Sequence, residues 1–285
     1  MKLDHIEIRV CAYVFQADFD SRDTIFKVGR NEFTRADFEC MCPGMLVSRE
    51  LDILKEVASI IPNHNVDYVI VICVCLNVVD NIDDGLEGVL QTTYQFSEDF
   101  VDDVANGNTV EVLHKFYERD WMGRYDRLTL IYVPIEDSRG HWYLMVISTE
   151  NRKIYHLDTH LREDFVEERQ QTIRNICSAL AKIVDIVYDG FVTFCALADF
   201  DCWDIVEARG VPNCGNSDNS ALWVAEWLNM QNSFTNNICG VMDEKITRMM
   251  VTIRILMGNH NQCNNDLIRK AREFWKMMTT DDENP

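Results

Sequence analysis

Residues 141–158 read HWYLMVISTENRKIYHLD, which has the composition of two short strands joined by a tight turn. HWYLMVIS and IYHLD are rich in aromatic and β-branched residues, and the TENRK between them is polar. RLTLIYVPI (127–135) predicts a further strand, separated from the first two by the turn DSRG. Strands that follow one another so closely are expected to pair antiparallel, which predicts the centre of a sheet.

The ends of this predicted hairpin carry two chemically useful side chains. His141 opens one strand and Asp158 closes the next, so antiparallel pairing brings the imidazole and the carboxylate to the same edge of the sheet. A carboxylate that accepts a hydrogen bond from a histidine orients the ring as a general base. The two residues are therefore candidates for the base and the orienting member of a catalytic triad.

VPNCGNSDNSALWV (211–224) predicts a loop followed by a helix. The apolar residues within 221–228 are spaced to form one helix face, which places Ser220 in the first turn. Ser, Asp and Asn are the preferred helix N-caps. The cap can therefore be any of Ser217, Asp218 and Ser220, and Ser220 needs no catalytic role to explain it.

The rest of the chain predicts an α+β domain around this sheet. Residues 78–107 are acidic and weakly periodic, so we interpret them as a long surface excursion that can contact a partner. The apolar run 68–79 is too short to span a bilayer and predicts a buried element. We expect one domain over 1–285, with a core at about 30–230 and a C-terminal helical extension at about 241–278. Further strands are predicted at 5–15 and 203–211, and helices at 34–41, 47–61, 109–119, 162–184, 241–257 and 264–277.

The composition limits which classes of partner the protein is expected to bind and in which cellular compartment it is expected to lie. The chain has 27 Lys and Arg against 47 Asp and Glu, a net charge of −20, which repels phosphate backbones and anionic lipid. Neither nucleic acid nor a membrane is therefore an expected partner. The first residues alternate polar with apolar and lack the apolar region of a signal peptide. We expect an intracellular protein of the nucleus or the cytoplasm.

The cysteines and histidines do not predict a metal centre. The eleven cysteines are scattered and several lie in apolar runs, which is typical of reduced core thiols. Two CxC pairs lack the second CxxC or CxxH that would complete a zinc site. His156 and His160 flank Asp158 in an HxDxH pattern that resembles a metal site, and two strand-end histidines are the favoured interpretation. No cofactor is predicted.

Three motifs together resemble the ubiquitin-like-protein proteases, the cysteine peptidases that process and remove SUMO-type modifiers. LIYVPIEDSRGHWYLMVI (130–147) is similar to the family's strand, its VPI turn and its HW pair, and YHLDT (155–159) resembles its YYDS motif. VPNCGNSDNSALWV is similar, without a gap, to the family's PQQxNGxDCGxxV. Segments 34–44 and 47–61 also resemble plant members, including those associated with mobile elements.

The resemblance implies a papain-like cysteine peptidase fold, with a central antiparallel or mixed sheet flanked by helices. It implies His141 as the general base and Asp158 as the residue that orients it. Ser220 stands at the position of the nucleophilic cysteine, and Cys214 at that of the glutamine that donates to the oxyanion. Trp142 matches the tryptophan that borders the channel for the modifier's Gly-Gly tail, and it can equally be ordinary core.

The nucleophile segment departs from the family at two chemically important positions. An alcohol at 220 is a far weaker acid than a thiol and would have to be deprotonated by His141 during attack. A thiol at 214 is a weak donor, and losing one oxyanion donor typically costs about 3 kcal/mol. Losing a triad nucleophile costs on the order of a millionfold in rate. The sequence therefore predicts a ubiquitin-like protease domain that is catalytically degraded.

Two alternatives stay open. The same fold can serve as a non-catalytic binding module for a ubiquitin-like modifier or another protein, and Cys214 can act as a displaced nucleophile near His141. SUMO-type modifiers often present acidic surfaces, so a chain this acidic needs a local basic patch to bind one. Only KITR (245–248) and RKAR (269–272) suggest such a patch. A different partner is therefore also considered.

Overall fold

A computed structural model describes residues 4–16, 19–42, 93–117, 128–161, 163–187, 199–213, 220–229, 243–258 and 261–281. The helix predicted at 47–61, the apolar run 68–79 and Cys214 lie outside these residues. The chain divides into two compact units, one formed by residues 1–87 with 240–285 and the other by residues 88–239. The single domain over 1–285 stays a prediction. None of the described helices is both long and apolar enough to cross a membrane.

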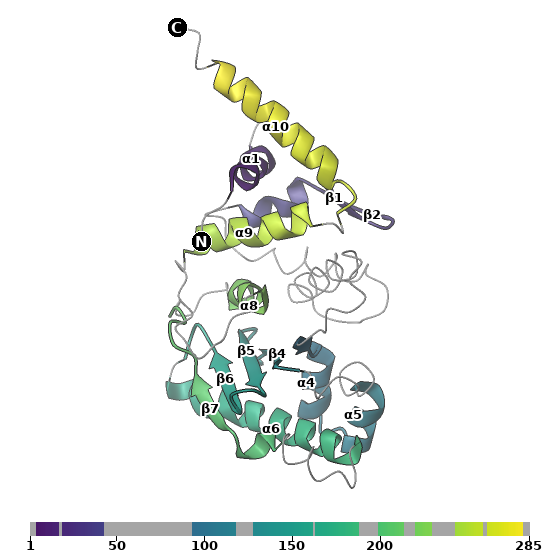
Figure 1. Cartoon of the computed structure of the whole chain (residues 1–285), viewed down its shortest axis with the longest axis vertical. Coiled ribbons are helices and arrows are strands. Elements are labelled where there is room, and N and C mark those ends of the chain that lie inside the picture. Colours follow the sequence, from purple (N-terminus) through teal and green to yellow (C-terminus); the bar gives the residue numbers. More distant parts are fainter. Residues whose placement is uncertain are drawn as a thin grey trace. The chain divides into compact units, whose positions relative to one another are not determined.

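Residues 88–239 are built around a five-stranded mixed sheet with the order β3-β4-β5-β6-β7 (Figure 1). Strands β4 (Leu130–Glu136), β5 (Trp142–Ser148) and β6 (Lys153–Leu157) form the predicted antiparallel meander. Strands β3 (Thr93–Gln95) and β7 (Asp204–Glu207) pair parallel to β4 and β6 at the two edges. The predicted α+β fold with a central mixed sheet is confirmed.

Helices α6 (Glu163–Val187) and α8 (Ser220–Asn229) cover the central strand (Figure 1). Every residue of β5 is buried, as expected of a strand covered on both faces. Its alternate residues Tyr143, Met145 and Ile147 share one core with the apolar stripe of α6. Helix α8 contacts β5, and its residues 220–228 are all buried. Both helices lie where the apolar spacing predicts them.

The predicted surface excursion at 78–107 is wrong over its described part, which begins at 93. It contains β3 and the helix α4 (Glu98–Ala105), and α5 (Val110–Tyr117) follows as predicted. Phe96 and Phe100 are fully buried, with ring centroids 4.3 Å apart. The apolar residues of this acidic segment have helical spacing, so that Phe100, Val101 and Val104 fall on one helix face against the core.

The other unit begins with α1 (His5–Val14), so the strand predicted at 5–15 is wrong. A capping box starts this helix: the Asp4 carboxylate accepts from the N–H of Glu7 at 2.8 Å, and the Glu7 carboxylate accepts from the N–H of Asp4 at 2.6 Å. The apolar alternation stops at Val10. The buried residues then share one helix face, and they are Val10, Cys11, Tyr13 and Val14.

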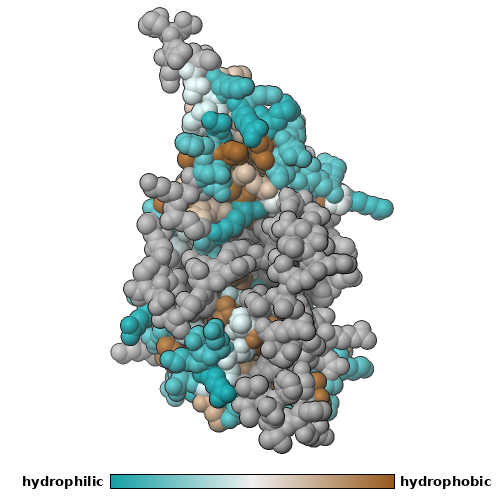
Figure 2. Space-filling view, in the orientation of Figure 1, coloured by the Kyte–Doolittle hydropathy of each residue, from teal (hydrophilic) through white to brown (hydrophobic). Residues whose placement is uncertain are grey.

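A hairpin and two further helices complete this unit. Strands β1 (Thr24–Val28) and β2 (Asn31–Thr34) pair antiparallel, and η1 (Ala36–Met41) is a 3₁₀-helix where the sequence predicts a helix over 34–41. Thr34 ends β2 and donates its N–H and hydroxyl to Asp37. Helices α9 (Glu244–Met257) and α10 (Asn264–Asp281) lie where predicted. The face of this unit drawn in Figure 2 is mostly hydrophilic, around a small apolar area.

Asn261 joins the hairpin to the connection between α9 and α10. Its side chain donates to the carbonyls of Ile25 and Leu256 at 3.1 and 2.7 Å. It also accepts from the N–H groups of Lys27 and Cys263 at 3.0 and 2.9 Å. Asn261 is 3% exposed. One buried carboxamide therefore satisfies backbone groups more than 200 positions apart in the chain.

Asn261→Ala is expected to lower the free energy of unfolding by about 2–4 kcal/mol, because it leaves buried backbone donors and acceptors without partners. Urea denaturation followed by circular dichroism measures the loss. The exposed Asn265 on α10 provides a control, and Asn265→Ala should change stability by less than about 0.5 kcal/mol. Equal effects of the two substitutions would contradict the bridging role of Asn261.

Candidate functional site

The structure brings His141 and Asp158 together where the inner strands β5 and β6 begin and end. His141 directly precedes β5 and Asp158 directly follows β6, and the imidazole Nε2 lies 2.7 Å from the carboxylate Oδ1. The turn before His141 is closed by hydrogen bonds between the backbones of Asp137 and Gly140 and of Asp137 and His141, both 2.9 Å. Gly140 has a φ of 78°, a conformation that favours glycine. The turn therefore fixes where the imidazole enters the site.

Asp158 is held as a buried carboxylate. Its side chain is 1% exposed, and Oδ1 also accepts from the N–H of His160 at 2.8 Å. Burial would raise the pKa of Asp158, but the hydrogen bonds from His141 and His160 and the nearby Arg169 charge lower it to about 2. An ionised Asp158 accepts from Nε2–H of His141 and leaves Nδ1 as the basic nitrogen. This is the tautomer that a general base acting through Nδ1 requires.

Arg169 on α6 is the functional-site residue that the sequence analysis misses. Its Nη1 donates to Asp158 Oδ2 at 2.5 Å and to the carbonyl of His160 at 2.9 Å. Its Nη2 donates to Asp137 Oδ2 at 2.8 Å. The guanidinium is 2% exposed and thus ties the turn before His141 to the end of β6. The signal was available, because Arg169 interrupts the apolar stripe of α6 four residues before Ile173.

Asp137 completes the buried network at the turn. Its Oδ1 accepts from the N–H of His141 at 3.1 Å, while Oδ2 faces Arg169. Burial raises the pKa of Asp137, but the hydrogen bonds from Arg169 and from the backbone hold it below its usual range. Two carboxylates therefore share one guanidinium, and each of them also contacts His141. The network holds both the backbone and the ring of the candidate base.

Ser220 is the first residue of α8, as the apolar spacing predicts. Its Oγ accepts a hydrogen bond of 3.0 Å from the N–H of Trp142, the peptide group that follows His141. The residue is 2% exposed. The structure therefore places the hydroxyl at a helix N-terminus and next to the strand that carries the imidazole. A helix N-terminus favours negative charge, which is the form of an activated nucleophile.

The remaining predicted site residues have simpler surroundings. Trp142 is 5% exposed within β5, and its role in a substrate channel stays a prediction. Cys214 lies outside the described residues, so its oxyanion role also stays a prediction. His156 and His160 are both buried beside Asp158. In the part of the chain that the structure describes, no group of three His, Cys, Asp or Glu side chains is arranged to hold a metal ion.

An antiparallel meander with a His–Asp pair at its edge, next to the N-terminus of a buried helix, defines the class of papain-like cysteine peptidase folds. A family profile described as the Ulp1 protease family, C-terminal catalytic domain, matches residues 94–254, more than half of the chain. The chain belongs to the Ulp1 protease family. No curated protein matches it.

Solved structures of SUMO proteases share this fold at low identity. SUMO protease Ulp1 with its catalytic cysteine oxidised to a sulfenic acid has a TM-score of 0.52 at 16% identity, covering 94% of this chain and 98% of that one. The Ulp1 protease domain in complex with Smt3, the yeast ortholog of SUMO, has a TM-score of 0.51 at 16% identity, covering 92% and 98%. The Ulp1-like SUMO protease catalytic domain of Chaetomium thermophilum has a TM-score of 0.50 at 17% identity, covering 90% and 91%.

Acidification is expected to destabilise the fold through His156. Burial lowers the pKa of this histidine from 6.5 to about 4. Between these two pKa values the histidine is protonated in the unfolded chain and neutral in the folded chain. The free energy of unfolding therefore falls as the pH drops from 6.5 to about 4. The full effect is about 3 kcal/mol. Urea unfolding at the two ends of this pH range measures the loss of stability. His156→Phe cannot titrate at this position and should lose clearly less stability on acidification. If its pH dependence equals that of the unaltered protein, other groups cause the loss.

Proposed function

We propose that this domain binds a ubiquitin-like modifier and has lost most of the peptidase activity of its family. The observation that carries the proposal is Ser220 at the start of α8, with Oγ 3.0 Å from the N–H of Trp142. A thiol at this place would be driven toward the thiolate by the helix N-terminus and the histidine, whereas an alcohol stays neutral there. The site thus keeps the base and its supports and lacks a reactive nucleophile.

A hydrolase with a serine nucleophile is the second candidate, and the intact His141–Asp158 pair favours it. In that mechanism Nδ1 of His141 accepts the hydroxyl proton of Ser220 as Oγ attacks the carbonyl carbon of the last glycine in the modifier's tail. His141 then returns the proton to the leaving amine. Against this candidate, the Ser220 hydroxyl is buried and one of its lone pairs already accepts from Trp142.

The basic segments at 245–248 and 269–272 supply only a small cationic surface for an acidic modifier. In KITR, Arg248 is fully buried and its Nε donates to Glu244 at 3.0 Å. In RKAR, Arg269 pairs with Asp266 and Glu273, and Lys270 also pairs with Asp266. Three of the five Lys and Arg side chains in these segments are therefore balanced within the helices, whereas Lys245 and Arg272 are exposed. A modifier with a less acidic surface suits the proposal better than one that needs a basic patch.

Binding and cleavage can be measured separately with a panel of ubiquitin-like modifiers. Each modifier is prepared with its complete Gly-Gly tail, without that tail, and as a C-terminal fluorogenic amide. We expect at least one complete modifier to bind, the tailless form to bind more weakly, and the amide to remain uncleaved. Cleavage by the unaltered protein would establish the hydrolase instead. Failure of every modifier to bind would reject both candidates for this class of partner.

A further inference from the structure

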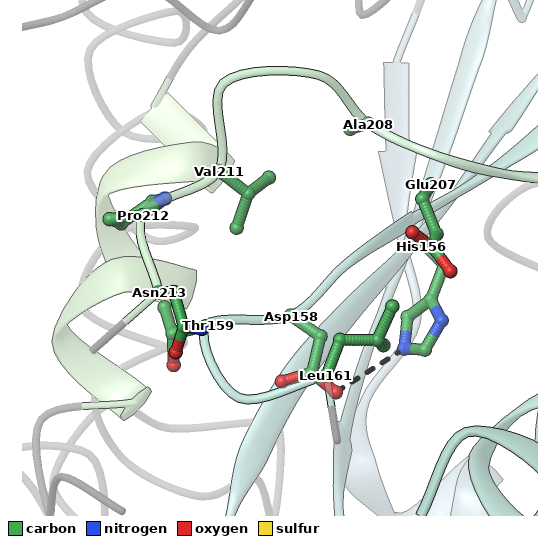
Figure 3. Close-up of a pocket in the computed structure, with 9 residues that line it drawn as sticks. All are labelled: His156, Asp158, Thr159, Leu161, Glu207, Ala208, Val211, Pro212 and Asn213. Atoms are coloured by element: carbon green, nitrogen blue, oxygen red, sulfur yellow. Dashed lines mark ion pairs between the residues drawn. The ribbon is translucent and has the colours of Figure 1, made fainter. Parts of the chain in front are cut away.

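A pocket of about 150 Å³ opens where β6 and β7 end (Figure 3). Its walls come from the end of β6 with Asp158 and Thr159, from Glu207 at the end of β7, and from the loop at 211–213. Figure 3 shows Val211 and this loop facing the strands across the pocket. The space corresponds to about five water molecules at roughly 30 Å³ each. It can therefore accept a short side chain.

Two fully buried polar groups in this pocket lack hydrogen-bond partners among the residues that the structure describes. The His156 side chain is 0% exposed, and neither of its ring nitrogens makes a hydrogen bond. Its Nε2 lies 3.6 Å from Oδ2 of Asp158, too far for a hydrogen bond. Thr159 is 1% exposed, and its Oγ1 also has no partner. Because buried polar groups in native proteins are nearly always satisfied, these atoms indicate an occupant of the pocket.

The charge of the pocket indicates what kind of occupant it takes. Asp158 is already balanced by Arg169 at 2.5 Å, but Glu207 makes no ion pair within the part of the chain that the structure describes. Burial lowers the pKa of His156 to about 4, so its ring is neutral at neutral pH and does not repel a cation. Carboxylate, neutral imidazole and hydroxyl groups can all accept a hydrogen bond. Part of the wall is apolar, with Leu161, Val211 and Pro212 among the lining residues.

We propose that this pocket binds a primary alkylammonium group, the chemistry of a lysine side chain presented by a partner protein. An ammonium has three donors and no acceptor, which matches Glu207, His156 and Thr159. Its hydrocarbon stem packs on the apolar wall formed by Val211 and Pro212 while the charged head reaches the polar end. This binding does not depend on whether Ser220 has any catalytic activity.

The probe that tests this site is n-butylammonium, with 1-butanol as its neutral counterpart of similar size. Binding is followed by NMR through the backbone amide signals of Thr159, Ala208 and Asn213, which line the pocket. We expect n-butylammonium to shift these signals with a millimolar Kd, and 1-butanol to bind at least about tenfold more weakly because charge-assisted hydrogen bonds are the stronger ones. Equal binding of the two probes, or shifts confined to other regions, would overturn the proposal.

Two charge-matched variants give the control. Glu207→Gln removes the pocket carboxylate and should weaken n-butylammonium binding about threefold to fivefold, the range for an exposed charge pair. Asp204→Asn removes an equal charge from an exposed residue at the other end of β7, which does not line the pocket, and should leave the Kd unchanged. If both substitutions change the Kd equally, the probe responds only to overall charge, and the site is rejected.

Discussion

Ser220→Cys is expected to form a covalent adduct with a ubiquitin-like modifier that ends in an electrophile, at least about a hundredfold faster than the unaltered protein. The new thiol would lie at the start of α8, within reach of the Trp142 N–H that now donates to the hydroxyl. The helix N-terminus and that donor both stabilise a thiolate, and the basic His141 favours its formation. Intact-mass analysis measures the adduct, and peptide mapping locates it among the other cysteines.

The controls separate a restored site from a merely exposed thiol. Combining Ser220→Cys with His141→Ala should remove most of the gain, because the thiol then loses its base. Ser220→Ala should not react at this position. If Ser220→Cys binds the modifier but stays inert, then the imidazole does not face position 220 and the assignment of Ser220 to the nucleophile position is wrong. Rapid adduct formation by the unaltered protein would contradict the loss of activity.

Arg169→Met is expected to lower the free energy of unfolding by about 3–5 kcal/mol, because it leaves the buried Asp158 carboxylate without the guanidinium that pairs with it and removes the nearer of the two arginines that pair with Asp137. Arg169 donates to Asp158 at 2.5 Å and to Asp137 at 2.8 Å from a position that is 2% exposed. Without the guanidinium, the pKa of Asp158 should rise, and stability should become more sensitive to mild acid. Denaturation at neutral and mildly acidic pH measures both effects.

Arg139 supplies a matched comparison in the same turn. Its side chain is 46% exposed and pairs with Glu168 at 3.1 Å and, at 3.7 Å, with Asp137, so Arg139→Met should cost about 1 kcal/mol or less. Nitrogen NMR of His141 adds a readout that stability alone does not give. We expect the Nε2–H tautomer to dominate in the unaltered protein and in Arg139→Met, and to lose its dominance in Arg169→Met. An unchanged tautomer in Arg169→Met would limit Arg169 to a structural role.

The sequence predicts the part of the site that depends on neighbours in the chain. The strands from 130 to 157 follow one another through short turns, so their antiparallel pairing, and with it the approach of His141 to Asp158, follows from local pattern. The first turn of α8 is also local, since the apolar spacing after Ser220 defines it. These features require no knowledge of long-range packing.

The features that the sequence analysis misses depend on which elements pack together. Arg169 contributes to the site only because α6 packs beside the turn that contains Asp137 and the end of β6 where Asp158 lies. At the N-terminus a local signal was present but outweighed: the Asp4–Glu7 capping box specifies a helix, whereas the polar–apolar alternation after it suggests a strand. The mistaken surface excursion shows that acidic residues can conceal the apolar face of a short helix such as α4.

The unit that contains α1 is assembled from both ends of the chain, since residues 1–87 fold with residues 240–285. Helix α1 packs against α9 and α10, so its partners are made only after residues 88–239. Residues 88–239, with the whole His141 network, are made in one uninterrupted stretch and can fold before α9 and α10 are made. A premature stop codon shortly after 240 would therefore leave the unit with the His141–Asp158 pair complete, while α1 would lack the two helices that it packs against.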